Sequence, residues 1–247
     1  MDEKLSRTEY LERTKDFWNS MLLVLPVMFF YQVSILAVAN ETNGVDFIWI
    51  IIVKLSEGPY KEYAIWVYLG FTGAIMLLMI VLSIVFRHKE RFSWNYVLPL
   101  VGECTLYAII LGVVAVVVTR WVIEANPEMT VSPAEIGPFS ILVISAGAGV
   151  YEEIVFRLVL FGGFLRIMKK GFEIPEVPAV VAAVVVSAAL FSLAHYLGPE
   201  PFRLASFTFR FVAGAIFCIL YALRGFAAAV YTHTIYDIVV LSLSQGE

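Results

Sequence analysis

The chain alternates between long apolar runs and short polar segments. Seven of the runs are long enough to cross a bilayer, which takes about 20 helical residues. Their near-continuous apolar character favours helices over the alternating strands of a membrane barrel. We therefore expect an all-α fold, a polytopic transmembrane helical bundle. Its expected spans are residues 17–39, 64–86, 97–119, 139–167, 177–197, 204–223 and 226–244.

Two segments do not fit this pattern of spans. Residues 1–16 are polar and charged, and we interpret them as a polar N-terminal segment that is soluble or forms an interfacial helix. Phe47–Val53 is apolar but too short to cross, so we expect an interfacial or re-entrant piece there. No internal repeat and no soluble second domain is visible. Residues 1–247 are expected to form a single membrane domain.

Composition supports this class. The 247 residues are 60% hydrophobic and 15% charged, with a mean hydropathy of +0.84, which is too apolar for a soluble domain of this length. The small net charge of −4 gives no indication of a nucleic-acid partner, so the expected surroundings are the lipid bilayer. Cys104 and Cys218 both fall in expected spans, where we predict that they are packing residues.

The distribution of lysine and arginine between the connecting segments predicts the orientation. It favours a multi-pass protein of the cell membrane with a cytoplasmic N-terminus and an outside C-terminus. The inside segments would hold Lys4, Arg7, Arg13, Lys15, Arg87, Lys89, Arg91, Arg166, Lys169, Lys170 and Arg224. The outside segments would hold Lys54, Lys61, Arg120 and Arg203.

The fourth span contains three charges in the run Tyr151–Arg157. A charge at membrane depth costs about 2.5–3.5 kcal/mol even on insertion scales, so such residues need partners. Glu153 and Arg157 are four residues apart, which places them on one helical face as an ion pair. Glu152 lies about 100° further round an α-helix and is expected to point elsewhere. One carboxylate thus has a local partner, and the other is available for chemistry.

Two later spans add further ionisable residues. His195 lies near the end of the fifth span, and His233 and Asp237 lie four apart in the last. With Glu152 they could hold and deprotonate a water, bind a metal or relay protons. A lone membrane histidine or a lone Glu–Arg pair is more often structural. The combination of all these residues in one apolar chain favours a functional site.

Residue counting does not place this site at one depth. At about 1.5 Å per residue, His195 lies near the outer end of its span and His233 nearer the inner end. The membrane face to which the site opens is therefore undetermined. Glu103 and Arg210 also lie in spans but in no recognisable motif, so a structural pairing or interfacial role is favoured for both.

In this order, the motifs resemble the CPBP family of intramembrane proteases, which includes CaaX proteases and bacteriocin-processing proteins and is also called Abi. The family pattern is Glu-Glu-x-x-x-Arg, then Phe-x-x-x-His, then His-x-x-x-Asn or Asp. This sequence supplies Glu152 to Arg157, Phe191 to His195, and His233 to Asp237. The resemblance covers about residues 139–244, the expected motif-bearing catalytic core.

The resemblance implies an intramembrane endopeptidase that cleaves a membrane-associated peptide or protein. A glutamate and a histidine would activate water, and donors would stabilise the oxyanion of the tetrahedral intermediate. A buried ion pair would orient the site. By motif position, these roles fall to Glu152 as base, His195 at the water, His233 and Asp237 at the oxyanion, and Glu153 with Arg157 as the pair.

Asp237 departs from family members that carry asparagine there, because an ionised aspartate cannot donate to an oxyanion. It would be protonated, or orient His233 by accepting its N–H, or bind a metal. Zinc is therefore an alternative, with His195, His233 and Glu152 as candidate ligands. The absence of a His-Glu-x-x-His helix favours a glutamate-type reaction without a cofactor.

Two other functions are open at this point. A non-catalytic immunity or regulatory partner in the membrane could keep these residues for packing. A proton-coupled carrier is less favoured, since such carriers usually show repeated halves with broken helices. The sequence does not select among a prenylated tail, a bacteriocin or pheromone leader and a membrane anchor as substrate. It gives no oligomeric state either.

Overall fold

The computed structural model describes residues 7–38, 54, 57–59, 61–86, 92–125, 137–197 and 201–244. Within these ranges the chain forms helices and connecting turns and contains no strand, which confirms the all-α prediction. Seven described helices could cross a membrane, and each starts and ends within three residues of the predicted span. They are Phe17–Ala37, Lys61–Val85, Trp94–Val118, Pro138–Lys170, Glu176–Leu197, Leu204–Arg224 and Phe226–Leu243. The predicted re-entrant piece, Phe47–Val53, lies outside the described residues.

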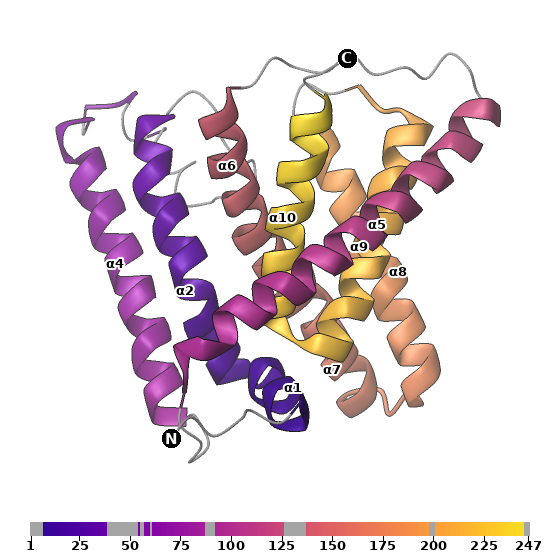
Figure 1. Cartoon of the computed structure of the whole chain (residues 1–247), viewed down its shortest axis with the longest axis horizontal. Helices are drawn as coiled ribbons and strands as arrows, with labels where there is room; N and C mark the ends of the chain where they lie inside the picture. The colour runs from indigo at the N-terminus through magenta and orange to yellow at the C-terminus, as the bar shows by residue number, and fades with distance from the viewer. Residues whose placement is uncertain are drawn as a thin grey trace.

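The N-terminal part forms a short polar helix followed by two spans. α1 (Arg7–Lys15) precedes α2 (Phe17–Ser34), which η1 (Ile35–Ala37) extends. Asp16 ends the first helix and caps the second, because its carboxylate accepts from the backbone N–H of Asn19 at 2.9 Å. α4 (Lys61–Phe86) packs beside α2 at one side of the bundle (Figure 1).

The third span crosses the bundle obliquely. η2 (Trp94–Tyr96) leads into α5 (Val97–Ala125), which packs against both α9 (Leu204–Arg224) and α10 (Phe226–Ser244). Figure 1 shows α5 running diagonally across the other helices. This course brings the start of α5 close to α1 and gives the early part of the chain contact with the C-terminal helices.

The fourth span is continuous but changes its winding. α6 (Pro138–Gly147) passes into η3 (Ala148–Phe161) and then into α7 (Gly162–Lys170). The middle segment is π-helical, so its N–H groups bond five residues back instead of four. Such segments are rare and often occur at functional sites. This winding was not predicted from the sequence, and it holds both glutamates of the first motif.

The last three spans complete the bundle. α8 (Glu176–Ala194) continues into η4 (His195–Leu197), and α9 (Leu204–Arg224) and α10 (Phe226–Ser244) form a hairpin. α10 is central and contacts α2, α5, α6, η3 and α9. Its residues 227–229 are alanines without exposed surface, which lets neighbouring backbones approach closely. Figure 1 shows α2 beginning and α10 ending at opposite ends of the bundle.

The turn between α9 and α10 requires glycine. Gly225 has a φ of +86°, a conformation that other residues adopt only with strain. A side chain there would also meet α1, because a Cβ would lie 2.8 Å from the Lys15 carbonyl oxygen. The close approach of α1 to this turn fixes where α10 starts.

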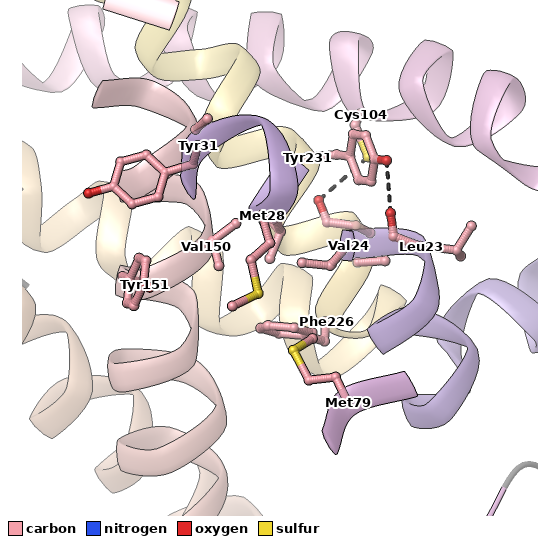
Figure 2. Packing of buried hydrophobic residues seen from close by; sticks show 14 of the residues in the cluster. Leu23, Val24, Met28, Tyr31, Met79, Cys104, Val150, Tyr151, Phe226 and Tyr231 are labelled. Atoms are coloured by element: carbon pink, nitrogen blue, oxygen red, sulfur yellow. Dashed lines mark hydrogen bonds between the residues drawn. The ribbon is translucent and has the colours of Figure 1, made fainter. Parts of the chain in front are cut away.

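The core lies between α2, η3 and α10. Figure 2 shows Met28 of α2 close to Val150 and Phe226, with Tyr31 and Tyr151 packed edge to face nearby. The hydroxyl of Tyr231 donates to the Leu23 carbonyl at 2.9 Å. The two cysteines are both buried and not joined by a disulfide, in agreement with the packing role expected for them.

Candidate active site

The buried centre of the site is the ion pair within the first motif. Arg157 Nη1 lies 3.1 Å from Glu153 Oε1, and neither side chain has exposed surface, which confirms the predicted pairing. The guanidinium also faces two aromatic rings, at 4.4 Å from the Phe191 centroid and 5.0 Å from that of Phe217. None of its three nitrogens has a hydrogen-bond partner among the described residues. The carboxylate and the two rings therefore balance this cation.

His233 is tied to this ion pair. Its Nδ1 lies 2.6 Å from Glu153 Oε1, and since a carboxylate only accepts, Nδ1 carries the proton and donates. The ring is buried and stacks on Phe217, with centroids 4.5 Å apart and planes 21° apart. Arg157, Glu153 and His233 thus form a chain of contacts that fixes the imidazole and directs Nε2 away from Glu153.

The carboxylates of Glu152 and Asp237 both lie near the other ring nitrogen of His233, Nε2. His233 Nε2 lies 3.8 Å from Glu152 Oε2 and 3.5 Å from Asp237 Oδ2. Glu152 is 6% exposed, whereas the side chain of Asp237 is 22% exposed. The Nε2 atom is therefore flanked by two acidic groups and can exchange a proton with either.

The position of Glu152 corrects the α-helical expectation that it points elsewhere than Glu153. Both glutamates contact the same imidazole, one at each nitrogen. The reason is the π-helical winding of η3, in which each residue advances through a smaller angle than in an α-helix. Adjacent side chains then diverge less, and a histidine ring fits between the two carboxylates.

His195 lies at the junction of α8 and η4. Its Nδ1 lies 2.9 Å from the Phe191 carbonyl oxygen, to which it donates, so its other nitrogen is left for the site. The Phe191 ring lies between the histidines, 5.1 Å from His195 and 6.1 Å from His233.

The three motifs therefore meet in one region. Residue counting placed His195 and His233 at different depths, but in the structure they lie in the same region. Counting measures depth from the end of each helix and ignores how far that end extends. The structure brings together the residues predicted from the sequence, which are Glu152, Glu153, Arg157, His195, His233 and Asp237.

Arg210 of α9 belongs to no motif, and a structural or interfacial role was expected for it. Its Nη1 donates to Ser206 Oγ at 2.7 Å, and its Cζ lies 5.7 Å from the centroid of the Tyr196 ring. Glu103, the other such residue, does have the expected structural pairing, since it bonds Arg224.

A network on the far side of η3 supports the site. The Gln32 amide of α2 donates to the hydroxyl of Tyr151, the residue before Glu152, and the hydroxyl of Tyr68 in α4 donates to the Gln32 side-chain oxygen. Thr72 also bonds that oxygen, at 3.3 Å. α2 and α4, which carry no motif, thus help to fix the rotation of the segment that carries both glutamates.

The candidate zinc ligands are not arranged as a metal site. In the part of the chain that the structure describes, no three His, Cys, Asp or Glu side chains are placed to hold a metal ion. The Nδ1 of His233 is occupied by Glu153, and that of His195 by a backbone carbonyl. A catalytic zinc site takes three protein ligands around one point, so these residues, as they lie, do not fit one.

Comparison with known proteins agrees with the motifs. Residues 134–239 match the family model described as "Type II CAAX prenyl endopeptidase Rce1-like". The match includes every candidate site residue and Arg210, and it confirms the resemblance for the motif-bearing part of the chain. No curated protein and no solved structure matches the chain. The match therefore indicates a likeness to CAAX-type proteases over residues 134–239, and the seven apolar helices indicate a multi-pass membrane protein.

Proposed function

We propose that the protein is an intramembrane endopeptidase that hydrolyses a peptide bond of a membrane-associated substrate with water activated by Glu152. The observation that carries this proposal is the meeting of Glu152 and His233 Nε2 in the interior of a membrane bundle. Charged groups at such depth are costly and are retained mainly for function. The family match supports the same reaction class.

In the first step, the Glu152 carboxylate takes a proton from a water molecule, and the water oxygen attacks the carbonyl carbon of the substrate. The carbonyl oxygen becomes an oxyanion. His195 assists, since its Nδ1 is bound to the Phe191 carbonyl and its Nε2 is left to accept a hydrogen bond from the water.

His233 then stabilises the oxyanion. Its Nδ1–H donates to Glu153, which is paired with Arg157, and a carboxylate at this nitrogen stabilises the positive charge of the doubly protonated ring. In that form Nε2–H is a charged donor in a site with little water, where such a contact contributes most. When the intermediate collapses, the C–N bond breaks and the proton on Glu152 passes to the leaving amine. One water is consumed for each bond cleaved.

Asp237 has a different role from that implied by motif position. As an ionised carboxylate at 3.5 Å from Nε2 it cannot donate to the oxyanion, and Glu153 already orients the ring through Nδ1. We assign to Asp237 the electrostatic stabilisation of the protonated ring. The donor role at the oxyanion falls to His233.

The direct test is Glu152→Gln in the purified, detergent-solubilised protein, with a set of plain and prenylated peptides as substrates. We expect cleavage to fall by at least about 100-fold, the usual contribution of a general base. Glu62→Gln, an exposed change in the first turn of α4, is the matched control. If Glu152→Gln cleaves as well as the wild type, the proposal is wrong, and a non-catalytic partner role is favoured.

The reaction proposed needs no metal, and this is tested separately by metal analysis beside cleavage with and without chelator. We expect unchanged cleavage after chelation. About one zinc per chain, with activity lost to chelator and restored by zinc, would instead require that the carboxylates and histidines rearrange into a ligand set.

A further inference from the structure

The aromatic side chain of Phe217 lies inside the buried site. It belongs to α9 and is 1% exposed. Its ring stacks on the imidazole of His233, with centroids 4.5 Å and planes 21° apart. The Arg157 guanidinium faces the same ring, with Cζ 5.0 Å from its centroid. Phe217 thus contacts both the histidine assigned to the oxyanion and the cation that is paired with Glu153.

The packing of α9 against its neighbours holds this ring in place. Gly214, one turn earlier in the chain, lets α9 approach α8 closely, because a Cβ there would lie 3.0 Å from Phe191 Cδ1. From α10, the Tyr236 ring meets Phe217 nearly edge to face, with centroids 6.1 Å and planes 77° apart. A ring braced from two helices keeps its face toward the imidazole.

Titratable groups lie on the other sides of the imidazole. Glu153 accepts from Nδ1 at 2.6 Å, and Glu152 and Asp237 lie 3.8 and 3.5 Å from Nε2. The Phe191 ring lies between the imidazole and His195. The three carboxylates therefore approach the ring nitrogens. Among these neighbours, only the stacked phenyl ring covers a face of the imidazole.

That face contact distinguishes the two protonation states of the imidazole. The face of an aromatic ring carries negative potential and attracts a cation within about 6 Å of its centroid, most strongly where water is excluded. The doubly protonated imidazole is such a cation, whereas the singly protonated ring is neutral and gains only ordinary stacking. The stacked geometry therefore favours the charged form of His233, which donates to the oxyanion in the proposed reaction.

We propose that Phe217 is a positioning residue that stabilises the doubly protonated form of His233 through its aromatic face and thereby strengthens the oxyanion donor. Its effect on cleavage rests on the proposed function, whereas its effect on the imidazole does not. The neighbouring ring of Phe191 differs from it. That ring lies closer to Arg157, at 4.4 Å, but meets the imidazole at 68° and does not stack on it.

The experiment changes the electron density of the ring and leaves its shape nearly constant. In the full-length, solubilised protein, Phe217 is replaced by phenylalanines with increasing numbers of fluorine atoms, which withdraw electron density from the ring face. Phe191 is fluorinated in the same way for comparison. The control is Phe161, which is also buried, packs edge-on against Tyr221 and faces no cation among the described residues.

Two quantities are measured for each protein. The first is the doubly protonated fraction of His233, at the pH where the wild-type ring is half protonated. It is read from the ring nitrogen signals of protein labelled with ¹⁵N-histidine, and the chain has three histidines in all. The second is kcat, with KM, for peptide cleavage. The first measurement needs no turnover.

With increasing fluorination of Phe217, we expect the doubly protonated fraction of His233 to fall stepwise. In parallel, kcat should fall by up to about tenfold, the size of one desolvated cation–π contact. KM should stay near its wild-type value, because the ring is buried and does not reach the substrate. Phe217→Leu should reproduce the loss of kcat. Fluorinated Phe161 should match the wild type in both quantities, and fluorinated Phe191 should change the protonated fraction less than fluorinated Phe217.

Three results would overturn the inference. The first is a protonated fraction that stays constant along the Phe217 series, which would mean that the ring only fills space. The second is an equal fall along the Phe191 series, which would mean that both rings act through Arg157. The third is a constant kcat while the fraction falls, which would remove the link to the oxyanion. If the wild type cleaves nothing, the proposed function fails, while the protonated fraction still decides how Phe217 acts on His233.

Discussion

We compare two Glu–Arg pairs that lie inside the described part of the bundle and differ in how completely they are hydrogen-bonded. Glu103 and Arg224 are 121 residues apart in sequence and join α5 to the end of α9. Glu153 and Arg157 are four residues apart within η3. The two pairs have the same chemistry and lie in the same membrane bundle, so the difference between them shows what each is for.

Both members of the Glu103–Arg224 pair make several hydrogen bonds. Nε and Nη2 of Arg224 donate to the two carboxylate oxygens at 2.6 and 2.8 Å. Arg224 also donates to Thr14 and to the Leu11 carbonyl in α1. The carboxylate accepts two more hydrogen bonds, from Tyr10 and Tyr107, each at 2.6 Å. These contacts, which we call the clamp, hold α1 against α5 and against the turn where α10 begins.

The Glu153–Arg157 pair lacks such support among the described residues. Glu153 Oε2 and the three nitrogens of Arg157 have no hydrogen-bond partner there, although both side chains are fully buried. The well-bonded contact of Glu153 is with His233 instead. A buried charge with few partners is costly, so the presence of the Glu153–Arg157 pair is best explained by the contact of Glu153 with His233. The first pair maintains the architecture, and the second maintains the state of one histidine.

The largest effect should come from Glu153→Gln. The neutral amide no longer favours the protonated His233 and leaves Arg157 without its counter-charge. We expect kcat to fall by about 10,000-fold, comparable with loss of the carboxylate behind a catalytic histidine, together with reduced stability. Cleavage assays and thermal unfolding in detergent measure both.

The double variant Glu153→Gln with Arg157→Met separates the two effects. Removing both charges should recover most of the lost stability, because no buried ion is left unpaired. Activity should stay low, since no negative charge then faces Nδ1. Recovered cleavage in the double variant would show that the pair serves stability alone.

The second prediction applies the same change to the other pair. Glu103→Gln leaves Arg224 without a counter-charge and should destabilise the protein by about 3 kcal/mol, the lower end for breaking a buried pair, because both side chains are partly exposed. In the folded fraction, kcat should stay within about threefold of the wild type, since the clamp does not contact the site. A large fall in kcat with unchanged thermal unfolding would reverse the assignment of the two pairs.

Whether the sequence could predict each pair depends on how far apart its two residues lie along the chain. Glu153 and Arg157 are on one helix, so their spacing sufficed. The seven spans could be predicted for the same reason, because each depends only on a local run of apolar residues. The partner of Glu103 could not be found this way. Arg224 is 121 residues distant, and only packing of α5 across α9 brings the two together.

The site shows a second limit of sequence reasoning. The motifs identified the residues but not their contacts, because an α-helical wheel separates Glu152 from Glu153 and the π-helical η3 does not. That Glu153 would bond His233 was equally hidden, since it depends on how η3 and α10 pack.

The third prediction concerns Asp237, which shares Nε2 of His233 with Glu152. Asp237→Asn removes a negative charge beside the oxyanion position and supplies an amide donor there. We expect kcat to change by less than about tenfold, in either direction, because the lost stabilisation of the protonated ring offsets the new donor. Asp237→Ala should be clearly less active than Asp237→Asn. Equal activity of the two variants would show that Asp237 does not contribute at Nε2.

The smallest expected effect is that of Tyr10→Phe, which removes one hydrogen bond of the clamp. Tyr10 of α1 lies outside the spans, and its hydroxyl donates to Glu103. Tyr10→Phe should cost about 1 kcal/mol of stability, the usual value for one such hydrogen bond, and should leave kcat unchanged.

The variant also changes how stability depends on pH. Burial, helped by the contact with Glu103, raises the pKa of Tyr10 above its ordinary value of 10.0. The unfolded chain therefore releases this proton near pH 10.0 while the folded chain keeps it, and stability is lost as the pH rises beyond that point. Tyr10→Phe should flatten this alkaline loss. Thermal unfolding of both proteins at about pH 8 and about pH 10.5 makes the comparison, and parallel alkaline losses would place Tyr10 outside the clamp. The exposed Glu62→Gln protein should behave like the wild type at both pH values, which separates the clamp from general effects of alkali on the surface.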